Sequence, residues 1–113
     1  MKSEPQVGFR FPSPERIVKV LFPLANIQRI VVLQNLLKGE KRFGALLRSL
    51  KTTHSPLRFH LKVLLESGYV GQEGKRGPYY ITPKGRTILL FLESLAEPPS
   101  AGTQDLLPED VPR

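Results

Sequence analysis

A charged, glycine-rich segment, Gln72-Glu73-Gly74-Lys75-Arg76-Gly77-Pro78, separates the short β-forming runs Tyr69-Val70-Gly71 and Tyr79-Tyr80-Ile81. Two such runs around a turn of this composition predict a β-hairpin with a basic tip. The segments before and after the hairpin are predicted to be helices. The sequence therefore predicts a mainly α fold with a single small β-hairpin, in the α+β class.

Helix-start and helix-stop signals divide the first half of the chain. Ser13 followed by Pro14 predicts a helix start, and Pro23 is expected to end this first helix. Asn26 is placed to cap a second helix, whose apolar residues recur at helical spacing until Gly39. A short third helix is predicted from the spacing of Phe43, Leu46, Leu47 and Leu50.

A longer helix is predicted after the polar break Lys51-Thr52-Thr53, with Thr53 as its cap and Gly68 as its stop. Its inward face is expected to hold Leu57, Leu61, Leu64 and Leu65. The outward face is then expected to hold His54, Ser55, Arg58 and Lys62, with Phe59 near the margin.

The last predicted helix is capped by Thr82, starts at Pro83 and is apolar nearly all round. One small domain cannot cover every face of it, and the first helix is also apolar on more than one side. We therefore expect a homodimer through the terminal helices; the alternative is that the two helices pack on each other within one chain. The expected interface residues are Ile17, Leu21, Ile88, Leu89, Phe91, Leu92 and Leu95.

The length of 113 residues is enough for one domain. We expect a flexible arm at residues 1–12, the folded domain at residues 13–96, and a disordered, acidic, proline-rich tail at residues 97–113. The chain has no cysteine, and neither a signal peptide nor a membrane-spanning stretch is apparent. The expected location is the cytoplasm.

The net charge of +7 is unevenly distributed along the chain. Residues 97–113 hold four carboxylates and one arginine, a net charge of −3, which leaves +10 on residues 1–96. A basic domain of this kind favours a polyanion partner, since each lysine or arginine placed on a phosphate releases counterions. The alternative is that the excess charge only keeps the protein soluble.

Two neighbouring helices followed by a basic hairpin form an arrangement that suits double-stranded DNA, because the major groove admits one α-helix. Arg58 can pair with guanine, while Lys62 is better placed for the DNA backbone. The hairpin tip is expected to lie on the adjacent backbone or minor groove. The candidate DNA-binding residues are Arg48, Lys51, Thr53, His54, Ser55, Arg58, Phe59, Lys62, Lys75 and Arg76.

The stretch from Leu24 to Thr82 resembles the ArsR-type winged helix-turn-helix regulators, most specifically in His60-Leu61-Lys62-Val63-Leu64 followed by Gly68. The segment Tyr80-Ile81-Thr82-Pro83-Lys84-Gly85 is also similar to MarR-like, PadR-like and archaeal winged helices with a long terminal helix. The resemblance implies a repressor-like dimer on a palindromic or pseudo-palindromic operator. It also implies that the fourth helix is the recognition helix and that the terminal helices dimerise.

Other functions find little support in the residues. Metal or redox sensing is not expected, because there is no cysteine and the only histidines are His54 and His60. No catalytic residue, metal site or cofactor is expected, since the glycines at 71, 74 and 77 lie in a hairpin and not in a phosphate-binding loop. The alternative function is a winged-helix protein-interaction or RNA-associated module. The sequence identifies no effector, although a pocket near Phe22 and Phe91 is where one would be sought.

Overall fold

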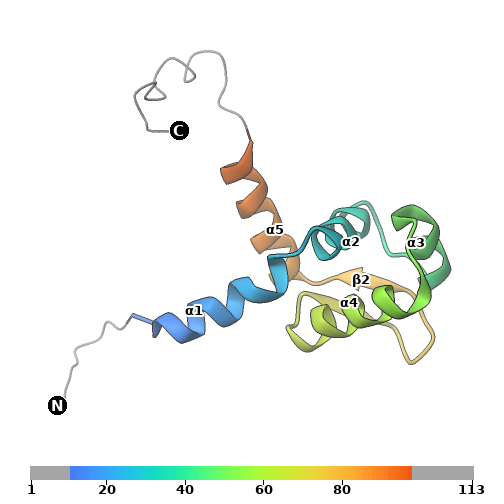
Figure 1. The fold of residues 1–113 in the computed structure, drawn as a ribbon, viewed down its shortest axis with the longest axis horizontal. Coiled ribbons are helices and arrows are strands. Elements are labelled where there is room, and N and C mark those ends of the chain that lie inside the picture. The colour runs from blue at the N-terminus through green and yellow to red at the C-terminus, as the bar shows by residue number, and fades with distance from the viewer. Residues whose placement is uncertain (1–10, 98–113) are drawn as a thin grey trace.

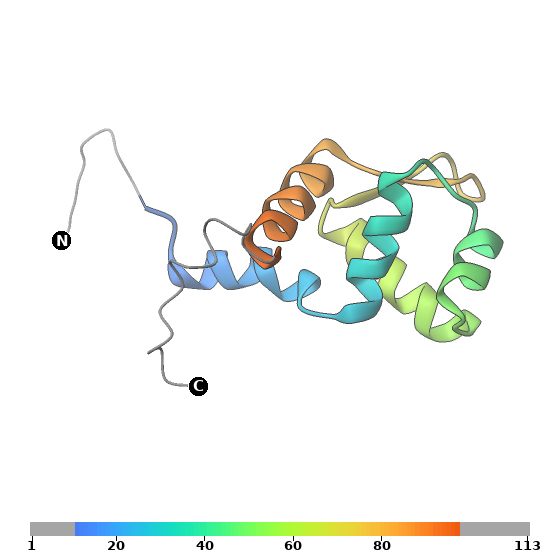
Figure 2. The ribbon, with the colours of Figure 1, turned by 90° about the horizontal axis from the view of Figure 1, so that it is seen from above.

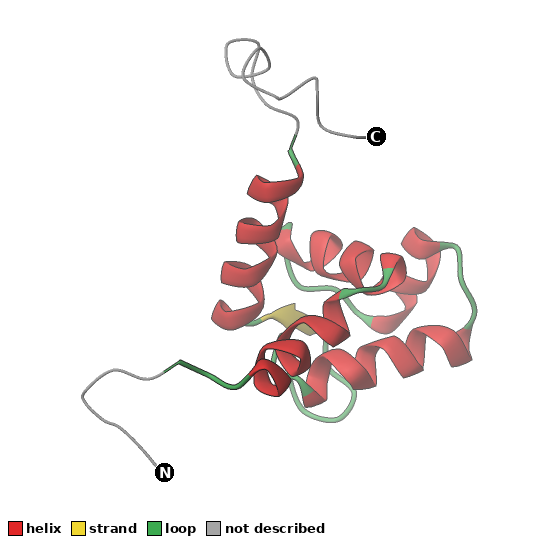
Figure 3. Cartoon of the chain, turned by 60° about the vertical axis from the view of Figure 1, so that its left-hand side comes forward, coloured by secondary structure: helices red, strands yellow, loops and turns green. Residues whose placement is uncertain are grey.

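The computed structural model describes residues 11–97, so most of the expected arm and all but one residue of the expected acidic tail lie outside the described residues. Helices make up most of this part, and the strands lie among them (Figure 1, Figure 3). The elements are α1 (Pro14–Leu21), a 3-10 turn η1 (Phe22–Leu24), α2 (Ile27–Leu37), α3 (Phe43–Leu50), α4 (His54–Glu66), β1 (Val70–Gln72), β2 (Tyr79–Ile81) and α5 (Pro83–Ala96). The predicted order of elements is confirmed.

Side chains at the predicted helix starts cap three of the helices. Ser13, Asn26 and Thr82 each accept a hydrogen bond from the backbone N–H three residues further on, at 3.3, 3.1 and 3.0 Å. Each bond satisfies one amide that the first turn of the helix leaves without an internal partner. Thr53 precedes α4 without a side-chain capping bond. Thr53 therefore has the position and extended backbone of a cap, as predicted, but not the side-chain hydrogen bond.

The core lies where α2, α3, α4 and α5 meet the hairpin, and the views show α2 crossing α4 (Figure 1, Figure 2). Its fully buried side chains are mainly leucines, and burial of each such side chain stabilises the fold by about 1.5–3 kcal/mol. They are Val32, Leu33, Leu36, Leu46, Leu57, Leu61, Leu64, Tyr69 and Leu89.

The hairpin pairs β1 with β2 in antiparallel register, with Val70 opposite Ile81. A third segment joins it, because Lys41 and Tyr79 exchange two backbone hydrogen bonds of 3.0 and 2.8 Å. The sequence did not predict this pairing. It attaches the link between α2 and α3 to the turn end of the hairpin, where Tyr79 pairs with Gln72.

The terminal helices leave the body in different directions (Figure 1). Helix α1 has no buried residue, and its contact with the body includes a 2.7 Å hydrogen bond from the Tyr69 hydroxyl to the carbonyl of Val20. An open groove of about 500 Å³ runs between the two helices and is lined by Val20, Ile88 and Phe91 among others. The alternative that α1 and α5 close on each other within one chain is therefore not what the structure shows.

The expectation that Leu89 lies at a dimer interface is wrong, because its side chain is 1% exposed in the core of its own chain. Ile88 and Leu92 are partly buried against the same core. The other expected interface residues remain exposed: Ile17, Leu21, Phe91 and Leu95.

Candidate nucleic-acid interface

The outer face of α4 carries the polar side chains that the sequence placed there. His54, Ser55, Arg58 and Lys62 are all exposed, while the leucines of the opposite face are buried or partly buried. Phe59 is 58% exposed, so it belongs to the outer face and not to its margin. The face is therefore polar and cationic with one aromatic ring in its middle.

One aromatic side chain of α3 positions two of these residues. The guanidinium carbon of Arg58 lies 5.0 Å from the ring centroid of Phe43, within cation–π range. The His54 ring centroid lies 5.4 Å from the same ring. Phe43 thus restrains the first two turns of α4 on the side facing the hairpin.

A hollow of about 240 Å³ separates α4 from the hairpin, and three predicted cations border it. Arg58 lies on one side, and Lys75 and Arg76 of the hairpin tip lie on the other. The tip is held by Gln72, whose side-chain amide donates to the carbonyls of Lys75 and Gly77 at 3.2 and 3.0 Å. The recognition-helix candidate and the wing candidate therefore share one cationic surface, as expected from the sequence.

Lys41 and Arg42, two cations that the sequence analysis missed, extend this surface. Together with the predicted Arg48 they line a neighbouring hollow of about 710 Å³ beside α3. Arg42 Nη1 donates to the carbonyl of Arg76 at 3.2 Å, which connects this hollow to the wing. The adjacent basic residues Lys41-Arg42, between the predicted second and third helices, were the available signal.

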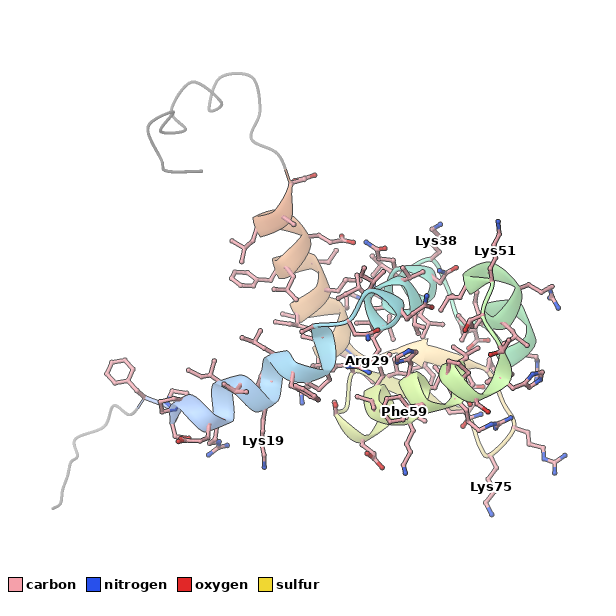
Figure 4. All side chains as sticks on the ribbon, viewed as in Figure 1. Lys19, Arg29, Lys38, Lys51, Phe59 and Lys75 are labelled. Atoms are coloured by element: carbon pink, nitrogen blue, oxygen red, sulfur yellow. The ribbon has the colours of Figure 1, made fainter. Side chains whose placement is uncertain are left out.

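Lys51 is not brought into the same surface. It ends α3 in the left-handed region, with φ of 53°. In Figure 4 its side chain points away from that of Lys75. Thr53 is exposed at the start of α4, close to His54 in sequence. Of the ten candidates, Arg58, Lys75 and Arg76 line the hollow between α4 and the wing, and Lys51 does not.

A buried cation supports the inner side of α4. Arg29 is 6% exposed; its Nε donates to the carbonyl of Pro23 at 2.6 Å and its Nη1 to Nδ1 of His60 at 3.1 Å. Burial lowers the pKa of Arg29. Burial and the neighbouring Arg29 both lower the pKa of His60, which favours the neutral imidazole as an acceptor. His60 therefore has a packing role and does not belong to the outer face.

Within residues 11–97, no three histidine or carboxylate side chains are grouped as metal ligands would be. Among these residues no single helix is long and apolar enough to cross a membrane, although α1 with η1 and α2 would pass together as a pair bent by 74°.

No family model matches the sequence, and no curated protein matches it. Several solved structures are similar to it. The chain is similar to a homodimeric winged helix-turn-helix DNA-binding domain from Mycobacterium bovis, described as a possible ArsR-family regulator (24% identity, 73% of this chain and 79% of that chain, TM-score 0.64).

It is also similar to a protein from Enterococcus faecalis assigned to the MarR family (24% identity, 80% and 88%, TM-score 0.67). A third similar structure is the transcriptional repressor BigR from Xylella fastidiosa (24% identity, 77% and 91%, TM-score 0.62). The chain has a winged helix-turn-helix fold. In this fold α3 and α4 form the helix-turn-helix and the hairpin is the wing.

Proposed function

We propose that the protein is a transcription regulator that binds double-stranded DNA as a homodimer, with α4 in the major groove and the wing on the adjacent backbone or minor groove. It acts as a repressor in the cytoplasm and is not an enzyme. The similar structures support this proposal, since their names describe transcriptional regulators and one describes a repressor.

The observation that carries the proposal is the shared hollow between Arg58 on α4 and Lys75 and Arg76 on the wing. A helix in the major groove brings its outer side chains to base edges, and cations on both sides of it can then reach the phosphates of the flanking backbone. Arg42 and Arg48 add charge beside α3. A surface used only for protein contacts would not need cations on three consecutive elements.

The homodimer part rests on exposed apolar side chains of the terminal helices. Ile17 and Leu21 on α1 and Phe91 and Leu95 on α5 are 44–67% exposed in the single chain. Large apolar side chains that stay exposed in the single chain are typical of protein interfaces. The similar domain from Mycobacterium bovis is described as homodimeric, which agrees with this part of the proposal.

The test is to select bound fragments from the host genome, footprint the best of them, and titrate salt against that duplex and against a structured RNA. Wild-type affinity for the duplex is expected to fall steeply as salt rises. Arg58→Ala should lose about 1–3 kcal/mol of binding free energy and relax base preference at one position. The double variant Lys75→Ala with Arg76→Ala should weaken binding to all sequences alike. It should also lower the salt slope, which is the slope of the logarithm of affinity against that of salt concentration, by about two.

Lys38→Ala is the matched control, because Lys38 is an exposed cation whose side chain points away from Lys75 (Figure 4). It removes the same charge from a position that lines neither of the two hollows and should leave the dependence of affinity on salt unchanged. Equal losses for Lys38→Ala and Arg58→Ala would contradict the proposed surface. Stronger binding to the RNA than to the duplex would favour the RNA-associated alternative.

A further inference from the structure

Phe59 is an unusual side chain for its place in the molecule. It is 58% exposed, and among the described residues from 28 to 79 no other large hydrophobic side chain is exposed. The remaining exposed apolar side chains lie on α1, η1 and α5, at the start of α2 and at Tyr80, apart from Phe11 before α1. Phe59 is therefore an isolated ring on a polar helix face and not part of the apolar surface assigned to the dimer.

Helical spacing puts the ring at the centre of the outer face of α4. Ser55 lies one turn before Phe59 and Lys62 nearly one turn after it, so all three project from the same side. Arg58 projects toward the wing from the neighbouring position. Figure 4 shows Phe59 on α4 between the part of the molecule that carries α1 and the part that carries Lys75. Whatever lies against this face of α4 must meet the phenyl ring.

The ring is also restrained from behind. Its centroid lies 5.7 Å from that of His60 in an edge-on arrangement, and His60 is held by Arg29. An aromatic side chain has few rotatable bonds, so a neighbour on one side removes much of its remaining freedom. Phe59 is thus presented to the outside in a restricted orientation.

The floor of the major groove offers hydrogen-bond donors and acceptors at every base pair, but only thymine adds an apolar group, the methyl at C5. A phenyl ring cannot pair with the polar base edges, whereas it can exclude water from that methyl. We infer that Phe59 is a specificity-determining residue that packs on the 5-methyl group of a thymine beneath α4. This inference rests on the proposed function and adds to it the base that this position reads.

The test uses the footprinted duplex remade with uracil in place of each thymine in turn, a change that removes one methyl group and keeps the pairing. Wild-type protein should lose about fourfold in affinity at one or two thymines per half-site, the value expected for exposing one methyl group. With Phe59→Ala the thymine and uracil duplexes should bind equally at those positions. Phe59→Leu, which keeps an apolar side chain, should retain part of the difference.

Arg58→Ala is the control, since it weakens binding through a different contact and should keep the thymine-to-uracil ratio of the wild type. Because Phe59 is exposed, the variants should unfold at the same temperature as the wild type. Duplexes without a preferred thymine, or a uracil effect that persists in Phe59→Ala, would overturn the inference while leaving DNA binding intact. Failure to bind any duplex would instead reject the proposed function, and this inference with it.

Discussion

Nη1 of Arg29 lies 3.1 Å from Nδ1 of His60 and joins α2 to α4 inside the domain. The same guanidinium holds the carbonyl of Pro23, so one side chain connects three elements. A buried cation is costly unless its donors are satisfied, and here the imidazole must be neutral to accept the bond. The protonation state of His60 is thereby linked to the stability of the fold.

Acid should therefore destabilise the protein through His60. Its pKa in the folded chain lies below the ordinary value of 6.5, because burial and then Arg29 oppose the charged form. In the unfolded chain the imidazole takes up its proton first, so the free energy of unfolding is at its full value above about pH 6.5 and falls as the pH drops toward the folded pKa. Urea unfolding at a series of pH values measures this.

His60→Gln removes the titrating group but keeps an acceptor, and it should flatten the pH dependence below 6.5. Ser55→Ala, on the exposed side of the same helix, changes no titrating group; it is the control and should keep the wild-type profile. A profile that is unchanged in His60→Gln would show that another group is responsible.

Leu89 and Phe91 stand two residues apart on α5 and should respond differently to substitution, because Leu89 is 1% exposed and Phe91 is 56% exposed. Leu89→Ala should lower the free energy of unfolding by about 2–5 kcal/mol through loss of core contacts. Phe91→Asp should instead weaken the dimer at least about tenfold, since it places a charge in an apolar interface. Sedimentation at several concentrations, with urea unfolding, separates the two effects. A Phe91→Asp protein that stays dimeric would contradict the proposed interface.

Lys51→Gly should stabilise the protein. Lys51 has a φ of 53°, a conformation in which the Cβ atom is strained and which glycine adopts freely. Relief of the strain, less the added freedom of the unfolded chain, should raise the free energy of unfolding by about 0.5–1 kcal/mol. Lys51→Ala removes the same charge but keeps the Cβ, and should stay within about 0.5 kcal/mol of the wild type. Equal stability of the two variants would show that the conformation carries no strain.

Arg42→Ala should weaken duplex binding although Arg42 was not among the residues expected to bind. The substitution removes one cation from the surface and the hydrogen bond that holds the carbonyl of Arg76 in the wing, so affinity should fall and its dependence on salt should decrease by about one charge. Arg42→Lys keeps the charge and separates the two contributions. The matched control is again Lys38→Ala, and affinity unchanged from that of the wild type would exclude Arg42 from the interface.

The helix starts at Ser13, Asn26 and Thr82 were predictable because a cap depends on a few adjacent residues. The shared surface of α4 and the wing followed from the order of the elements, once Gly68 and the basic turn had been placed. These predictions needed no knowledge of distant contacts.

The features that the sequence did not predict depend on contacts between distant segments. The run of apolar residues in α5 covers all sides of the helix, so its spacing could not show that Leu89 faces the core. The pairing of Lys41 with Tyr79 joins residues far apart in the sequence and leaves no periodic signal. The burial of Arg29 was equally hidden, because a charged residue at the start of a helix is usually solvated.

The backbone pairing of Lys41 with Tyr79 also fixes the wing in position beside α4. A hairpin of two three-residue strands is marginal by itself, and the added pairing attaches it to the segment that leads into Phe43 and the support of Arg58. The gap between α4 and the wing is consequently preorganised. If the proposed function holds, little conformational entropy would remain to be lost on association with DNA, and this backbone pair would favour both affinity and shape selectivity.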